Sequence, residues 1–198
     1  MTQNTFKSLV SVTSNFSQEM MPIVNLKYCS EDNILKRPIY QSKLCLVEVE
    51  TFKRLQAATT SLWNQGFKLV IWDAFRPIDV QKKMWQLLPD SHLVALPPED
   101  EDKSNIVPSK YNGMELDLAL ANKDGKLLPM PSPYEDRSKA SWLASHHVQS
   151  MEYKYGKVLK TALEDAGFTS QLFCWWKFKN EADPVVPYLD SSVYKFFE

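Results

Sequence analysis

The chain has 198 residues, of which 44% are hydrophobic, and its 23 basic and 24 acidic residues give a net charge of −1. This length suffices for one hydrophobic core, so we expect residues 1–198 to form a single domain. The near-neutral charge argues against a nucleic-acid-binding protein and against a surface drawn to anionic membranes. Three cysteines without C-x-x-C spacing argue against a disulfide framework and a structural zinc site.

The sequence also carries no sign of export or membrane insertion. Its N-terminal segment lacks a basic start followed by an apolar stretch, and no apolar run approaches the length of a membrane span. We therefore expect a cytoplasmic protein.

The first half of the chain predicts a helix, a buried strand and a second helix in succession. Residues 48–66 place apolar side chains on one helical face, and Gly66 is the expected C-cap. Residues 68–74, KLVIWDA, form a short apolar run typical of a buried strand. The second helix is expected directly after Pro77.

The second half begins with a proline-rich, acidic stretch at residues 96–109, which predicts a loop or a lid. Residues 114–120, MELDLAL, alternate strictly, so Glu115 and Asp117 share one face of a strand and the leucines share the other.

Two further elements complete the chain. We expect a long helix at about 145–166, ended by Gly167, and a final aromatic strand at 173–178. Because helices and strands interleave without a regular βαβ repeat, the predicted fold class is α+β.

Four polar residues around the predicted strands are candidates for function. Asp73 and Arg76 follow a buried strand, where they form either a structural ion pair or a site in which Arg76 binds a carboxylate. Glu115 and Asp117 lie either on a solvated outer face or on a face that the protein covers. The local pattern leaves both questions open.

Cys174 and Lys177 lie in the final strand, where simple alternation places them on opposite faces. A shared site would need a bulge or a strand end. Local pattern alone favours a buried cysteine and a lysine that extends to solvent. The histidines, His92, His146 and His147, lack the H-x-x-x-H and H-E-x-x-H patterns of zinc sites.

Taken in order, several segments resemble the zinc D-alanyl-D-alanine dipeptidases of the VanX type. The segments are Thr13–Phe16 with Ser17, VIWDAFRP at 70–77, Ser109–Leu120, MPSPYE at 130–135, and residues 159–168 followed by CWWKF. Each is weak alone, but their order and spacing are specific. The resemblance implies the dipeptidase or Hedgehog-type fold, a single α+β domain with a central, mainly antiparallel sheet flanked by helices.

The resemblance also shows where the sequence departs from the family, which holds zinc with two histidines and an aspartate. Only the aspartate is kept, as Asp117; Lys110 and Lys177 occupy the histidine positions. Cys174 replaces the general-base glutamate, and Glu115 replaces a small alanine. Because a lysine ammonium has no lone pair to offer a metal, we expect no bound metal, no other cofactor and no zinc-generated hydroxide.

The substrate-binding positions are largely kept. By resemblance, Arg76 stands where the family has the arginine that assists the reacting carbonyl. Ser109 stands for the serine that helps to bind the carboxylate, and Glu135 for the aspartate that binds the substrate ammonium. The expected ligand is therefore a small zwitterion, an amino acid or a dipeptide. The sequence does not predict the oligomeric state.

Lys110, Asp117, Lys177 and Glu115 are expected to cluster where the family binds its metal. They either fill the cavity as a buried ionic cluster or form an electropositive site for metal-independent chemistry such as proton transfer, cyclisation or acyl transfer. In the second case a lysine or Cys174 acts as base or nucleophile, with its pKa lowered by neighbouring ammonium groups.

Three functions follow from these alternatives. The protein is a metal-independent enzyme, a non-catalytic protein that binds or senses a zwitterion, or a peptidase that recruits a metal by another route.

Overall fold

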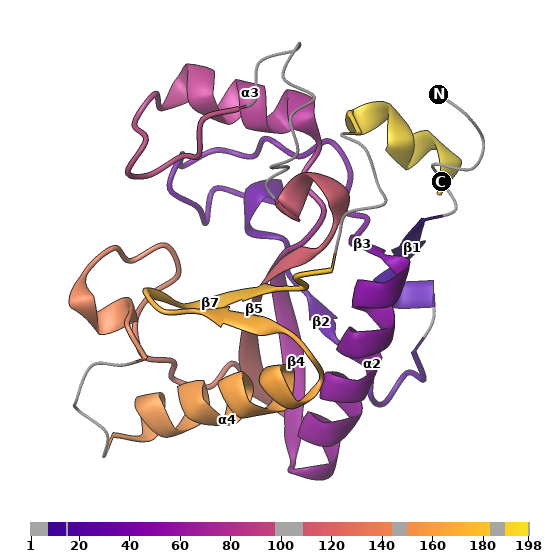
Figure 1. The fold of residues 1–198 in the computed structure, drawn as a ribbon, viewed down its shortest axis with the longest axis vertical. Coiled ribbons are helices and arrows are strands. Elements are labelled where there is room, and N and C mark those ends of the chain that lie inside the picture. Colours follow the sequence, from indigo (N-terminus) through magenta and orange to yellow (C-terminus); the bar gives the residue numbers. More distant parts are fainter. Residues whose placement is uncertain (1–7, 15, 98–108, 144–149, 183–188, 198) are drawn as a thin grey trace.

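A five-stranded sheet forms the centre of the computed structural model, which describes residues 8–14, 16–97, 109–143, 150–182 and 189–197 (Figure 1). Its strand order is β2-β4-β5-β7-β6. The strands are β2 (Ile23–Val24), β4 (Phe67–Asp73), β5 (Glu115–Asn122), β6 (Thr169–Gln171) and β7 (Cys174–Lys179). β2 pairs parallel with β4, and the other neighbours pair antiparallel. The predicted α+β class with a mainly antiparallel sheet is confirmed.

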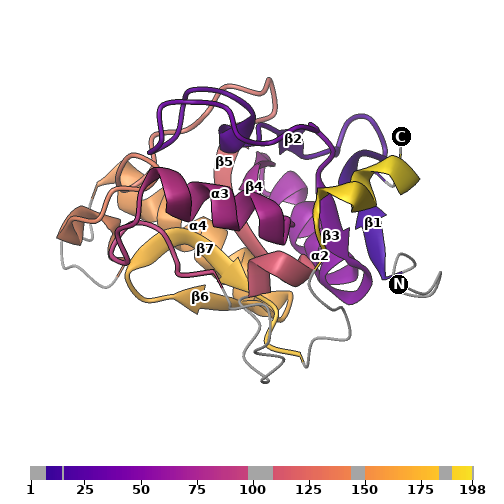
Figure 2. The ribbon, with the colours of Figure 1, turned by 90° about the horizontal axis from the view of Figure 1, so that it is seen from above.

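Three α-helices surround this sheet: α2 (Val49–Asn64), α3 (Ile78–Leu87) and α4 (Met151–Asp165). α2 and α4 pack against each other and against the sheet, whereas α3 lies over the end of the sheet where β4 ends and β5 begins (Figures 1 and 2). The helices predicted at 48–66 and after Pro77 are confirmed. In the described chain no helix is both long and apolar enough to span a membrane.

The helix ends follow from local chemistry. The Glu48 carboxylate caps α2 by accepting hydrogen bonds from two backbone amides, and the Ser150 hydroxyl caps α4. α4 therefore begins at Met151, later than the predicted start near 145, and residues 144–149 lie outside the described chain. Most of the predicted loop at 96–109 also lies outside it.

Smaller elements complete the fold. β1 (Leu9–Ser11) and β3 (Leu46–Glu48) form a separate antiparallel pair that the sequence did not predict. Short 3-10 helices lie at Val12–Ser14, Lys27–Cys29, Ser109–Asn112, Lys139–Ser141 and Ser191–Phe196. That residues 1–198 form one domain stays a prediction.

The two faces of β5 separate the core from the polar residues, as its alternation predicts. Leu116, Leu118 and Leu120 are fully buried in the main hydrophobic cluster, to which α2 and α4 also contribute. Glu115 and Asp117 lie on the opposite face, and Asp117 is buried as well. The sheet is therefore covered on both sides at this point, and Asp117 is not on a solvated outer face.

Candidate functional site

A cavity of about 270 Å³ lies at the α3 end of the sheet. Of the residues predicted to form the site, it is lined by Arg76, Lys110, Glu115, Asp117, Glu135 and Lys177. The structure thus brings together side chains that are up to 101 residues apart in the chain.

The structure leaves one of the other two predicted site residues untested and places the second away from the cavity. Ser109 begins a short 3-10 helix next to Lys110, but its side chain lies outside the described part of the structure. Cys174 is half-buried in β7 and does not line the cavity.

A β-bulge brings the acids of two strands onto the same face. Ile71 pairs with Leu118, and the next paired positions are Asp73 and Asp117, so Trp72 is an extra residue in β4. Because side chains alternate along a strand, this extra residue changes the face on which Asp73 emerges. Asp73 therefore faces the cavity side of the sheet together with Asp117.

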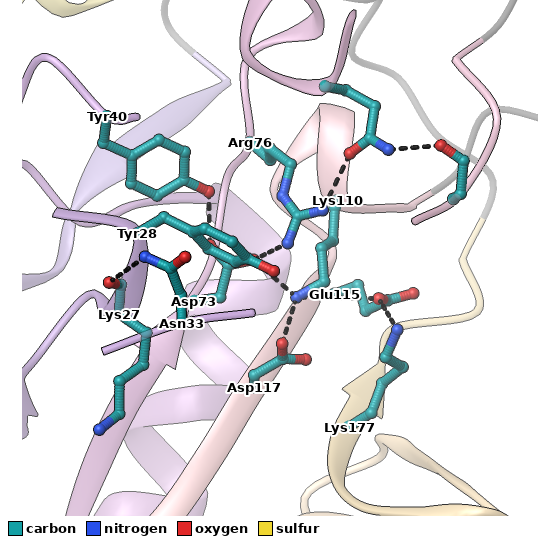
Figure 3. A network of polar contacts seen from close by, with 12 residues as sticks. Lys27, Tyr28, Asn33, Tyr40, Asp73, Arg76, Lys110, Glu115, Asp117 and Lys177 are labelled. Carbon is teal, nitrogen blue, oxygen red and sulfur yellow. Dashed lines mark hydrogen bonds and ion pairs between the residues drawn. The ribbon is translucent and has the colours of Figure 1, made fainter. Parts of the chain in front are cut away.

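The Lys110 ammonium occupies the centre of the site (Figure 3). Its Nζ lies 2.7 Å from Asp117 Oδ2 and 2.9 Å from Asp73 Oδ2, and it lies 4.0 Å from Glu115 Oε1. Only 8% of the lysine side chain is exposed. The predicted cluster of Lys110, Asp117 and Glu115 therefore forms, with Asp73 as a member that the sequence did not predict.

Lys177 joins the cluster from the neighbouring strand. It stands opposite Asp117 in the β5–β7 pairing, and its Nζ lies 3.1 Å from Glu115 Oε1. Burial alone would lower the pKa of this ammonium, but the carboxylates of Glu115 and Asp117 outweigh it and raise the pKa above the usual value. Lys177 is therefore a stably charged partner of the acids.

Arg76 is held on both sides. Its Nη2 donates to Asp73 Oδ2 at 2.5 Å, and its Nη1 donates to Gln81 Oε1 at 2.9 Å. The guanidinium also lies over the ring of Tyr28, 4.9 Å from its centroid. The structural Asp73–Arg76 ion pair considered from the sequence is therefore present, while the role of Arg76 toward a ligand stays a prediction.

Asp73 is a buried carboxylate whose ionised form is stabilised by its neighbours. Burial would raise its pKa, but Arg76, Lys110 and the Tyr40 hydroxyl, which donates at 2.5 Å, lower the pKa to about 2. Asp73 is thus ionised throughout the physiological range and balances the two cations that touch it.

Two tyrosines that the sequence did not single out complete the walls. The Tyr134 hydroxyl donates to Asp117 Oδ2 at 2.7 Å, and the Tyr28 hydroxyl donates to Glu135. Tyr134 directly precedes Glu135 in the MPSPYE segment, and this position next to a predicted site residue could have identified it from the sequence. Tyr28 has no such signal, because it lies 107 residues from its partner.

Glu135 lies beside this cluster with neutral partners. Its Oε2 accepts the Ile34 backbone N–H at 2.7 Å, in addition to the Tyr28 hydroxyl at the other oxygen. Its backbone has a φ of 63°, in the left-handed region. Burial raises the pKa of this carboxyl, and both hydrogen bonds oppose the rise. The carboxylate is therefore costly to keep ionised and gains from a further positive partner.

The lowered pKa values considered for Cys174 and Lys177 are contradicted by the structure, while their catalytic roles stay a prediction. Burial raises the pKa of the Cys174 thiol above its usual value, although Lys177 and Arg137 act in the opposite direction. The register between β6 and β7 shifts between Ser170 and Gln171, and such an irregularity is what a site shared by Cys174 and Lys177 would require. The thiol nevertheless stays protonated at neutral pH because the cost of burying a thiolate exceeds the attraction of the cations.

Alkylation of Cys174 tests this directly. In a variant with Cys29 and Cys45 replaced by serine, iodoacetamide should modify Cys174 more slowly at pH 7 than it modifies a small free thiol. The rate should rise as the pH increases toward the raised pKa, since only the thiolate reacts. Lys177→Met should slow the reaction further, because it removes a charge that lowers the pKa. Fast, pH-independent labelling from pH 6 to 8 would contradict the assignment.

The residues at the expected metal position do not fit a zinc ion. Lys110 already donates to Asp117 and Asp73, and an ammonium offers no lone pair. In the part of the chain that the structure describes, no three His, Cys, Asp or Glu side chains are grouped so that they could hold a metal. The arrangement instead pairs its carboxylates with the chain's own cations, although Asp117 Oδ1 is buried without a hydrogen-bond partner.

Comparison with known proteins gives a consistent relationship over most of the chain. The model of the D-ala-D-ala dipeptidase family matches residues 14–196. A D-alanyl-D-alanine dipeptidase of Escherichia coli strain K12 is 27% identical over 156 residues, covering 79% of this chain and 77% of the relative. Dipeptidases of the same description from Enterococcus faecium and Enterococcus faecalis are 24% and 25% identical, covering 80% and 85% of this chain and 85% and 92% of the relatives.

Proposed function

The chain belongs to the D-alanyl-D-alanine dipeptidase family, and we propose that it binds a small amino-acid or dipeptide zwitterion without hydrolysing it by zinc chemistry. The observation that carries this proposal is the position of Lys110. Its ammonium pairs with Asp117 and Asp73 beside a cavity of about 270 Å³, at a position where the family resemblance places a zinc ligand.

The charges of the cluster support a stable binding site. Three cations, from Arg76, Lys110 and Lys177, pair with three carboxylates, from Asp73, Glu115 and Asp117, so the cluster is formally neutral. A buried neutral cluster of this kind holds its geometry without a metal, although it contributes little net stability. It supplies one wall of a cavity that opens beside Glu135.

The same charges do not favour a metal-independent reaction carried by Lys177 or Cys174. A general base must lose its proton near neutral pH, and a nucleophile must be deprotonated to attack. The pKa values of both groups are raised, so Lys177 stays protonated and Cys174 stays a thiol. A binding or sensing protein is therefore the function that the site supports best.

Binding and hydrolysis of D-alanyl-D-alanine, measured on the same preparation, test this proposal. Titration calorimetry should detect binding to one site per chain, and an assay for released alanine should detect no turnover, with or without added zinc. Without the zinc-activated nucleophile and its base, roughly 5 kcal/mol or more of barrier lowering is lost, which is several orders of magnitude in rate.

The Escherichia coli relative serves as the positive control for hydrolysis. Chelator-sensitive turnover by this protein at a rate near that of the control would refute the loss of zinc chemistry. An absence of binding across a panel of free amino acids and dipeptides of both configurations would refute the binding function.

A further inference from the structure

The charged side chains that line the cavity are, with two exceptions, paired with one another. The paired ones are Arg76, Lys110, Glu115, Asp117 and Lys177, with Asp73 behind them as a further partner. Among the described residues, the remaining two, Glu135 and Arg137, take part in no ion pair. One is an anion and the other a cation, and both face the same cavity.

Glu135 supplies the unpaired negative charge. Its two oxygens accept hydrogen bonds from the Tyr28 hydroxyl and the Ile34 backbone amide, which are neutral donors. Each carboxylate oxygen has two lone pairs, so these bonds leave capacity for another donor. An ammonium group would supply both the donor and the missing charge.

Arg137 supplies the unpaired positive charge at the rim. Its Nη2 donates to the backbone carbonyl of Leu93 at 3.1 Å, which ties this exposed side chain to another segment that lines the cavity. A guanidinium carries five N–H donors, so most of its donors stay available to a carboxylate. Arg137 is two residues from Glu135, so their Cα atoms lie at most roughly 7 Å apart.

Arg76 is a poorer candidate for a ligand carboxylate. Its terminal nitrogens donate to Asp73 and Gln81, and the residue is 8% exposed. Gln81 in turn donates to the Ala95 carbonyl at 2.5 Å, so the guanidinium is fixed in the wall of the cavity. Arg76 therefore holds Asp73 and Gln81 in position and leaves little of its own surface for a ligand.

We infer that Arg137 binds the carboxylate of the ligand, opposite the ammonium-binding position that the family resemblance gives to Glu135. The ligand is then an amino acid or short peptide with both charged ends free. This assignment rests on the proposed binding function and adds a residue to it. Two opposite charges near each other on one short segment favour a dipolar ligand over one that carries a single charge of either sign.

Titration calorimetry with three ligands measures the contributions of the ligand's carboxylate and of its ammonium separately. D-Alanyl-D-alanine carries both charges, its N-acetyl derivative keeps only the carboxylate, and its C-terminal amide keeps only the ammonium. Arg137→Gln should weaken binding of the first two by ~10- to 100-fold and leave the amide unaffected. Glu135→Gln should weaken binding of the dipeptide and its amide and leave the acetyl derivative unaffected.

Matched variants complete the experiment. Lys139→Gln removes an exposed charge two residues from Arg137 and should change no affinity. Arg137→Lys should recover only part of the loss, because an ammonium cannot form the forked pair with a carboxylate. Thermal unfolding of each variant checks that the fold is intact.

The outcomes distinguish this inference from the proposed function. If the dipeptide binds to the wild-type protein and Arg137→Gln behaves like Lys139→Gln, Arg137 is an ordinary solvated side chain and the inference is wrong, while the binding function stands. If no amino acid or dipeptide binds to the wild-type protein, the proposed function fails, and this inference fails with it.

Discussion

Replacing Lys110 with methionine should lower the free energy of unfolding by about 3–5 kcal/mol. Its ammonium is 2.7 Å from Asp117 and 2.9 Å from Asp73, and almost all of the side chain is buried. Without it, Asp117 keeps only the Tyr134 hydroxyl as a hydrogen-bonding partner for its Oδ2. A buried carboxylate that loses its cation is costly, so the midpoint of urea unfolding should fall sharply.

Two comparisons make this result specific. Lys160→Met breaks a half-exposed pair with Glu164 on α4 and should cost less than about 1 kcal/mol. Adding Asp117→Asn to Lys110→Met should recover part of the loss, because it removes the unbalanced charge. A cost for Lys110→Met no larger than that for Lys160→Met would show that the cluster is not the buried unit described above.

Restoring imidazoles should restore metal binding. The wild-type protein should purify with far less than one zinc per chain, whereas the triple variant Lys110→His, Lys177→His, Glu115→Ala should retain close to one. Two histidines and Asp117 then provide three donors that suit zinc, and removing Glu115 avoids a carboxylate left without its lysine. Elemental analysis after dialysis measures the effect.

The single variant Lys177→His is the control for this experiment. It offers one imidazole and leaves Lys110 in place, so it should retain little more zinc than the wild-type protein. Stoichiometric zinc in the wild-type protein, lost when Asp117 is replaced, would overturn the conclusion that the lysines do not fit a metal site.

The sequence predicts those parts of the site that depend on strand alternation and on ordered motifs. The pattern MELDLAL placed Glu115 and Asp117 on one face, and the structure confirms this arrangement. The order of the segments placed Lys110 and Lys177 near these acids, and both ammonium groups contact them. Strand alternation is a local property, and the ordered motifs keep the order and spacing that the family has. Both can therefore be inferred from one sequence.

The remaining features depend on contacts between distant segments. Tyr28 reaches Glu135 across 107 residues, and no spacing in the sequence indicates this contact. The pKa of Cys174 was predicted with the wrong sign because burial, which depends on packing, outweighs the charge of Lys177. Arg137 was missed because nothing in the sequence shows which surface cations lack a partner in the fold.

The extra residue in β4 also constrains how this site can be transferred or redesigned. Asp73 faces Lys110 only because Trp72 has no partner on β5. If Trp72 paired with Asp117 in a regular ladder, Asp73 would pair with Leu116 instead. Its carboxylate would then point into the leucine-rich layer beneath the sheet and leave Lys110 short of an anion. A graft that kept Ile71, Trp72 and Asp73 as consecutive residues of a regular two-stranded ribbon would fail for the same reason. A transfer of this site must therefore include the bulged backbone of β4 as well as the charged side chains.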